Sequence, residues 1–106
     1  MSSVETSVKV VRPSAALTAA TAAAFREDVL MAIAADTSGE VTIDMSHVDS
    51  VDNSGLAAIL AGYNAAKRHH KRLSMCGVAP AVRIVFELAQ LDRAVSVVDR
   101  QGLQAA

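Results

Sequence analysis

The sequence predicts an α/β fold, in which short strands and longer helices alternate along a chain of 106 residues. Short runs rich in Val, Ile and Leu alternate with longer runs whose apolar residues recur three and four positions apart. Helices that join successive strands imply crossover connections. We therefore expect a small mixed, mostly parallel sheet of about four strands, covered by three to four helices. A chain of this length should form a single domain, residues 1–106, with frayed tails at 1–6 and 101–106.

Composition narrows the classes of partner. Apolar residues make up 52 % of the chain and aromatic residues only 3 %, which favours alanine-rich helices packed closely on the sheet. The net charge of −1 lacks the basic surplus needed to bind nucleic acid or an anionic membrane. The single cysteine, Cys76, is typical of a reducing compartment. With no leader and no apolar run near the roughly 18 residues of a membrane span, we expect a cytoplasmic protein without membrane insertion.

The first half of the chain predicts a strand, a helix and a second strand. The β-prone residues of the first run are Val8, Val10 and Val11. Pro13 closes that run, and either Thr18 or Thr21 can cap the helix that follows. The apolar face of this helix consists of Ala22, Phe25, Val29 and Ile33, and the outward side carries Arg26, Glu27 and Asp28. Gly39 ends the helix, and the alternation over 41–45 predicts the second strand.

The second half predicts two further helices, each followed by a strand. The second helix runs to about Lys67, and its apolar positions are Leu56, Ile59, Leu60 and Tyr63. We expect Leu56, Ile59 and Leu60 to be divided between the core and a partner surface. The basic segment 67–72 follows as a solvated helix end, in which His69 and His70 point in different directions. After a strand at 73–77, Pro80 begins a third helix. One face of that helix consists of Val82, Val85, Phe86 and Ala89, and the last strand holds Val95, Val97 and Val98.

The segment 49–56, Asp-Ser-Val-Asp-Asn-Ser-Gly-Leu, joins the second strand to the second helix. Open α/β sheets place their ligands and contacts at the carboxyl ends of strands, where this segment should lie. Ser54 stands at the start of the helix, beside a glycine that lets another molecule approach the backbone. A serine hydroxyl in this position can cap the helix, attack a substrate or be phosphorylated.

The ordinary interpretation is that Ser54 caps the helix and stabilises it by about 1 kcal/mol relative to alanine. However, Asp49, Asp52 and Asn53 form a larger polar cluster than one cap requires. Phosphorylation would add roughly −1.5 to −2 charges beside the two carboxylates. The positive end of the helix dipole would partly accommodate that charge. Such a switch would act by repelling a partner rather than by refolding the chain.

The sequence offers no complete motif for catalysis, metal binding or nucleotide binding around Ser54. His47 is the nearest base in sequence to Ser54, but it precedes the turn and no Gly-x-Ser-x-Gly motif is present. Asp44, Asp49 and Asp52 cannot be assumed to converge on a metal, because Asp is common in turns. The chain also lacks a phosphate-binding glycine loop. We therefore expect no catalytic residue, no metal site and no cofactor, and a binding module rather than an enzyme.

Residues 41–56 resemble the signature of STAS domains, the sulfate transporter and anti-sigma factor antagonist family. In that signature, a Val/Leu-rich strand ends in Asp-Leu-Ser and leads within a few residues to Asp-Ser-Ser-Gly-Leu. Three later segments are also similar to the family: Lys71-Arg-Leu73, Pro80-x-Val82-Arg83 and Phe86-Glu-Leu-x-x-Leu-Asp-Arg93. The resemblance covers roughly residues 8 to 100. This chain departs from it at Asn53, which replaces the first serine, and at 14–18, which lack the usual Gly-x-Leu-Asp.

The resemblance implies a bacterial anti-sigma factor antagonist that is phosphorylated at Ser54. Its partner-binding residues would be Asp49, Asp52, Asn53, Ser54, Gly55 and Leu56. The implied partner is an anti-sigma factor and serine protein kinase of the histidine-kinase-like ATPase type, which binds the unphosphorylated form. A metal-dependent serine phosphatase would restore that form. The alternative is a constitutive docking subunit of a lipid-transport ABC complex or a stressosome-like scaffold. Exposed strand edges leave homodimerisation open.

Overall fold

The computed structural model describes residues 9–90 and 96–98, and in them strands and helices alternate as the sequence predicts. The elements are β1 (Lys9–Val11), α1 (Ala22–Ala35), β2 (Glu40–Asp44), α2 (Asn53–Arg68), β3 (Arg72–Cys76), α3 (Pro80–Leu88) and β4 (Ser96–Val98). The α/β class is confirmed. The expected tails, Val8 and Val95 lie outside the described residues. None of the helices in the described ranges is both long and apolar enough to cross a bilayer.

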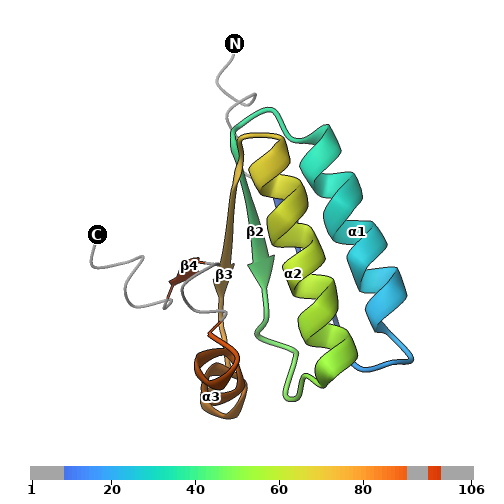
Figure 1. Ribbon diagram of the computed structural model, residues 1–106, viewed down its shortest axis with the longest axis vertical. Helices are drawn as coiled ribbons and strands as arrows, with labels where there is room; N and C mark the ends of the chain where they lie inside the picture. Colours follow the sequence, from blue (N-terminus) through green and yellow to red (C-terminus); the bar gives the residue numbers. More distant parts are fainter. Residues whose placement is uncertain (1–8, 91–95, 99–106) are drawn as a thin grey trace.

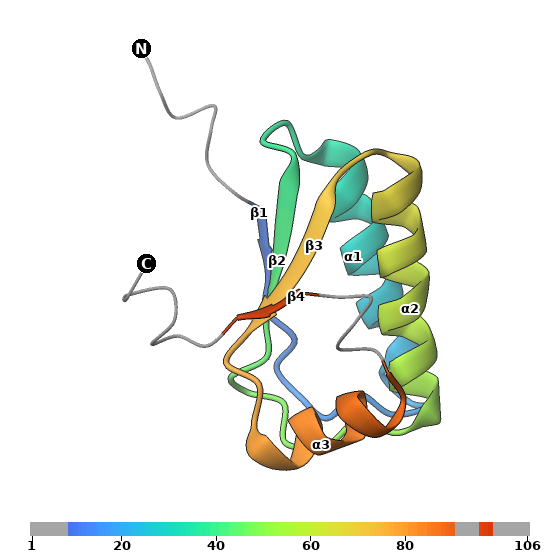
Figure 2. The same ribbon diagram turned by 60° about the vertical axis from the view of Figure 1, so that its left-hand side comes forward.

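The strands form a sheet in the order β1-β2-β3-β4, and each described pair is parallel. The predicted parallel pairing is therefore present, whereas the mixed pairing is not found among the described strands. Helices α1 and α2 lie side by side on one face of the sheet (Figures 1 and 2). They run in the same direction, so their first residues lie at the carboxyl ends of the strands, near α3. This arrangement is the one that sequential right-handed crossovers produce.

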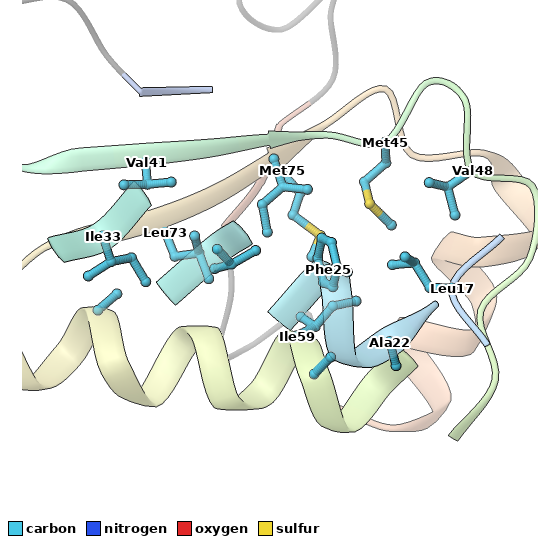
Figure 3. Packing of buried hydrophobic residues seen from close by; sticks show 14 of the residues in the cluster. Leu17, Ala22, Phe25, Ile33, Val41, Met45, Val48, Ile59, Leu73 and Met75 are labelled. Atoms are coloured by element: carbon cyan, nitrogen blue, oxygen red, sulfur yellow. The ribbon is translucent and has the colours of Figure 1, made fainter. Parts of the chain in front are cut away.

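The core fills the space between the sheet and the two parallel helices (Figure 3). In the register of β2 and β3, Val41 pairs with Leu73 and Ile43 with Met75, and all four are buried. Against them lies the predicted face of α1, which consists of Ala22, Phe25, Val29 and Ile33. Because that face follows from helical periodicity alone, the sequence predicts it correctly.

Helix α2 approaches α1 closely because small residues line its inner face. A Cβ atom on Gly62 would lie only 2.8 Å from Cγ1 of Val29. Ile59 is fully buried, whereas Leu60 is 42 % exposed, which divides the apolar positions of this helix between core and surface. In α3, Pro80 is the first residue, as predicted, and Val82 and Phe86 are buried.

Ala89 does not belong to the buried face of α3, contrary to the prediction. It is exposed and occupies the C-cap position, one residue beyond the end of the helix. The next residue, Gln90, has a positive φ of 61°. The helix therefore ends before the apolar spacing does.

The basic segment after α2 is only partly the solvated helix end that the sequence predicts. Lys67 and Arg68 lie in the last turn of α2 and are exposed. Lys71, in contrast, is largely buried, and its Nζ donates hydrogen bonds to the carbonyl oxygens of Ile33 (2.5 Å) and Asp36 (2.6 Å). Lys71 thus caps the C-terminal end of α1, where a cation is favoured by the helix dipole.

The carboxylate of Asp36 is buried in the same place. It accepts hydrogen bonds from Ser38 Oγ and from the backbone N–H of Gly39, both at 2.7 Å. Lys71 Nζ lies 3.8 Å from Asp36 Oδ2. Burial alone would raise the pKa of Asp36, but these hydrogen bonds and the positive charge of Lys71 together hold that pKa below its ordinary value.

Candidate functional site

The candidate site lies at the carboxyl ends of the strands, where the segments that precede α1 and α2 meet. Leu17 and Val51 form an isolated parallel β-bridge between these two segments. The backbone N–H of Leu17 donates to Ser50 O, and that of Asp52 donates to Leu17 O, both at 3.0 Å. Leu17 is also buried in the core. The starts of the two helices are therefore held together by the backbone as well as by packing.

Asp52, rather than Ser54, is the N-cap of α2. Its backbone is extended, and its Oδ1 accepts a hydrogen bond from the N–H of Gly55 at 3.1 Å. Its Oδ2 accepts a second bond from the N–H of Ala19 at 3.3 Å. One carboxylate thus satisfies donors in the first turn of α2 and in the segment before α1. The interpretation of Ser54 as an ordinary helix cap is wrong, because the cap position is occupied two residues earlier.

The threonines before α1 also act differently from the prediction. Thr21 occupies the N-cap position, but its side chain makes no capping hydrogen bond. Its hydroxyl donates to Ala16 O at 2.6 Å and accepts from the N–H of Thr18 at 3.0 Å. The hydroxyl of Thr18 accepts from the N–H of Ala20 at 3.2 Å. These hydroxyls stabilise the loop that holds Leu17 rather than the helix itself.

Gly55 is buried where α2 meets the loop before α1. A Cβ atom at this position would lie 2.5 Å from Leu17 O, 2.8 Å from Leu17 Cβ and 2.9 Å from Val51 Cγ1. These distances are shorter than van der Waals contact. The sequence suggests that this glycine lets another molecule approach, but the segment that lies against it in the structure is the chain's own loop at Leu17.

Ser54 is the second residue of α2 and is half-buried. Its hydroxyl forms no hydrogen bond with any residue in the described part of the chain. It lines a groove of about 320 Å³ between α1 and α2. The other residues that line the groove are Ala22, Ala23, Arg26, Ala57 and Ala58. The hydroxyl thus lies next to the positive end of the α2 dipole without a structural role.

The remaining predicted residues surround this serine. Asn53 begins α2 and is exposed, as is Asp49 in the preceding loop. Leu56 is half-buried and packs against the core. The structure therefore brings Asp52, Asn53, Ser54, Gly55 and Leu56 together in one capped helical turn, with Asp49 on the loop that leads into it.

The described residues contain no group of three or more His, Cys, Asp or Glu side chains placed to bind a metal. Asp44 instead accepts hydrogen bonds from the N–H (3.0 Å) and Oγ (2.6 Å) of Ser46, and its Oδ2 lies 3.4 Å from Nε of Arg12. His47 is exposed, and no hydrogen bond joins it to Ser54. Within the residues described, no histidine or carboxylate is hydrogen-bonded to the Ser54 hydroxyl.

Sequence reasoning missed two residues of this site, Leu17 and Arg26. Leu17 lies in a segment without strand character, so its pairing with Val51 has no local signal. Arg26 is correctly predicted to lie on the outward side of α1, but its position beside Ser54 depends on how α1 packs on α2. Only a three-dimensional arrangement could bring these residues to the serine turn.

Comparisons with known proteins agree on the fold. The model of the family described as "Mlab, STAS domain" matches residues 3–99. The crystal structure of TM1081 from Thermotoga maritima, a candidate anti-sigma factor antagonist, has a TM-score of 0.74 at 20 % identity, with 83 % of this chain and 75 % of that chain covered. The NMR structure of TM1081 has a TM-score of 0.73 at 21 % sequence identity, with 85 % of this chain and 72 % of that chain covered. The structure of the anti-sigma factor antagonist SpoIIAA in its unphosphorylated form has a TM-score of 0.72 at 20 % sequence identity, with 91 % of this chain and 82 % of that chain covered.

Proposed function

Since this chain belongs to the STAS domain family, we propose that it is an anti-sigma factor antagonist whose binding to an anti-sigma factor is controlled by phosphorylation of Ser54. The observation that carries this proposal is the uncommitted hydroxyl of Ser54 at a helix start that Asp52 already caps. The fold is also that of SpoIIAA, an anti-sigma factor antagonist that has been described in an unphosphorylated form. A phosphoryl group can therefore be added to Ser54 without the loss of any hydrogen bond that stabilises the described fold.

The electrostatics of the turn suit a switch that acts at the surface. A phosphate adds roughly −1.5 to −2 charges at neutral pH. The free N–H groups and the dipole at the start of α2 favour an anion at this position by about 0.3–1 kcal/mol. Toward a partner, however, the phosphate would stand beside the exposed carboxylates of Asp49 and Asp52. A binding surface that is nearly neutral at Ser54 would become strongly anionic, and a partner fitted to the unmodified turn would be released.

We propose that the partner is an anti-sigma factor that is also a serine kinase of the histidine-kinase-like ATPase type, and that a metal-dependent serine phosphatase reverses the modification. The contact surface would consist of Asp49 and residues 52–56. In this scheme the chain acts in the bacterial cytoplasm as the substrate of the kinase and as its ligand.

Intact-mass spectrometry of the protein purified from its own cells, before and after phosphatase treatment, tests the modification. We expect a phosphatase-sensitive increase of one phosphate that Ser54→Ala abolishes. Ser50→Ala is the matched control, because Ser50 is an exposed serine on the same loop, and this variant should still be phosphorylated. Loss of the phosphate in Ser50→Ala but not in Ser54→Ala would refute the assignment.

A measurement of partner binding distinguishes the proposed phosphorylation switch from the alternative, a constitutive docking subunit. An anti-sigma factor captured by the wild-type protein should bind Ser54→Asp at least tenfold more weakly, since the substitution places a carboxylate where the unmodified hydroxyl would face the partner. Ser50→Asp adds the same charge on the same loop and should have a smaller effect. Equal affinity of wild type and Ser54→Asp would contradict control at Ser54 and would favour constitutive docking.

A further inference from the structure

We propose that Arg26 of α1 binds the phosphate of phosphorylated Ser54 across the groove between the two helices, so that the chain recognises its own modification. The inference rests on the proposed phosphorylation of Ser54 and specifies what the phosphate would contact. It gives Arg26 a role as the intramolecular partner of the phosphate.

The groove places the two residues in reach of one another. Ser54 and Arg26 both line it, one from the first turn of α2 and the other from the second turn of α1. Because α1 and α2 run parallel, both residues lie toward the same end of the helix pair (Figure 1). The other lining residues are all alanines, whose side chains end at Cβ. No long side chain of the lining therefore separates the guanidinium from the serine.

Arg26 has no other electrostatic partner among the residues that the structure describes. It is exposed, and neither of the ion pairs found there involves it. Its helical neighbours three and four positions away are Ala22, Ala23, Val29 and Leu30, so no carboxylate stabilises it along α1. Arg26 is also the sole charged side chain among the described residues that line the groove. Its cation is therefore available to a new anion.

The chemistry of the two groups matches. A guanidinium presents its N–H donors in a planar fork that binds two phosphate oxygens at once, which a lysine ammonium does not do. The phosphate would also lie beside the free N–H groups at the start of α2. The anion would then be contacted from both helices. When Arg26 folds over the groove to reach it, the alanine surface beside Ser54 would be covered as well.

Two effects on a partner follow from this arrangement. Phosphorylation would place negative charge at Ser54, and it would also engage the Arg26 cation and cover the alanine-lined groove that borders the proposed contact surface. An aspartate carboxylate would reproduce both effects only in part, because it carries less charge and fewer acceptor oxygens than a phosphate. We therefore expect Ser54→Asp to weaken partner binding less than true phosphorylation does.

The test uses the full chain with phosphoserine incorporated at position 54 during synthesis, so it does not depend on whether the cell phosphorylates this residue. The second pKa of the phosphate is measured by ³¹P NMR titration in the wild-type background and in Arg26→Gln, Arg26→Lys and Arg68→Gln. Arg68→Gln is the matched control, because Arg68 is an exposed arginine in the last turn of α2, at the other end of the helix.

Contact with Arg26 stabilises the dianion, so Arg26→Gln should raise the second pKa of the phosphate by about 0.5–1 unit. Arg26→Lys should raise it by less, and Arg68→Gln should leave it unchanged. In the unphosphorylated protein, Arg26→Gln should leave the thermal midpoint unchanged. Equal pKa values in the wild type and Arg26→Gln, or the same shift in Arg68→Gln, would overturn the proposal. Failure to find phosphate on Ser54 in cells would instead refute the proposed function and leave this measurement valid.

Discussion

Replacement of Gly55 by alanine gives a severe test of how the serine turn is built. The new Cβ atom would lie 2.5 Å from the carbonyl oxygen of Leu17 and within 3.0 Å of two further carbon atoms. The nearest of these atoms belongs to the backbone, and that carbonyl already accepts the N–H of Asp52 at 3.0 Å. It cannot move away without loss of the hydrogen bond. The collision must therefore displace the loop before α1 or the first turn of α2.

The expected change in the free energy of unfolding of Gly55→Ala is the balance of opposing contributions. Overpacking of a well-packed site typically costs about 1–3 kcal/mol. If the loop moves, the backbone hydrogen bonds of Leu17 with Ser50 and Asp52 weaken as well, each worth about 1 kcal/mol. Against this, alanine favours a helix over glycine by at most about 1 kcal/mol. We expect Gly55→Ala to lower the free energy of unfolding by about 2–3 kcal/mol.

Urea denaturation followed by circular dichroism measures this change. The matched control is Gly62→Ala in the same helix, where the new Cβ atom would meet a single side-chain atom of Val29 at 2.8 Å and no backbone carbonyl. This variant should be destabilised less than Gly55→Ala. A Gly55→Ala protein as stable as wild type, or more stable than Gly62→Ala, would refute the conclusion that the bridge between the helix starts requires glycine.

Three further predictions concern charged residues. Asp52→Ala removes the α2 cap and should lower the free energy of unfolding by about 1–2 kcal/mol in urea denaturation, whereas Asp49→Ala, an exposed site on the same loop, should change it by less than about 0.5 kcal/mol. Lys71→Met removes both hydrogen bonds to the end of α1 and should cost about 2–3 kcal/mol; an equal cost in Lys67→Met, at an exposed site, would contradict this role. Because the folded-state pKa of Asp36 lies below its ordinary value, its carboxylate stabilises the fold above that ordinary value, and this contribution is lost as the pH falls through the lower folded-state pKa. The difference in thermal midpoint between wild type and Asp36→Asn should therefore shrink on acidification from pH 7, and a constant difference would count against the charge of Asp36 as the cause.

The parts of the fold that the sequence predicts correctly are those with a local signal. The buried face of α1 follows from the spacing of Ala22, Phe25, Val29 and Ile33, and Pro80 marks the first residue of α3. The start of α2 had no such unique signal, because Asp52, Asn53 and Ser54 are three successive residues that favour the N-cap position. The choice among them depends on Leu17, whose carbonyl binds the N–H of Asp52 from a distant part of the chain. Local sequence could not contain that information.

The same reason explains the error at Lys71. Its neighbours in the basic segment are exposed, and composition alone suggests the same for Lys71. Its side chain nevertheless reaches two carbonyl oxygens at the end of α1, because β3 begins beside that helix end. The same holds for the candidate site. The motif around Ser54 can be recognised in the sequence, whereas the position of Arg26 beside Ser54 depends on the packing of α1 against α2.

Gly55 and Gly62 lie about two turns apart on the buried side of α2. Each lets a neighbouring segment approach to a distance at which no larger residue fits. Sliding or rotation of α2 would bring its larger side chains against these segments, so we expect α2 to undergo no slow rearrangement when the protein binds a partner. Under the proposed phosphorylation of Ser54, the binding state should then follow the modification as fast as the modifying enzymes act, without hysteresis. A population of these molecules would report the present ratio of kinase to phosphatase activity and keep no memory of earlier ratios.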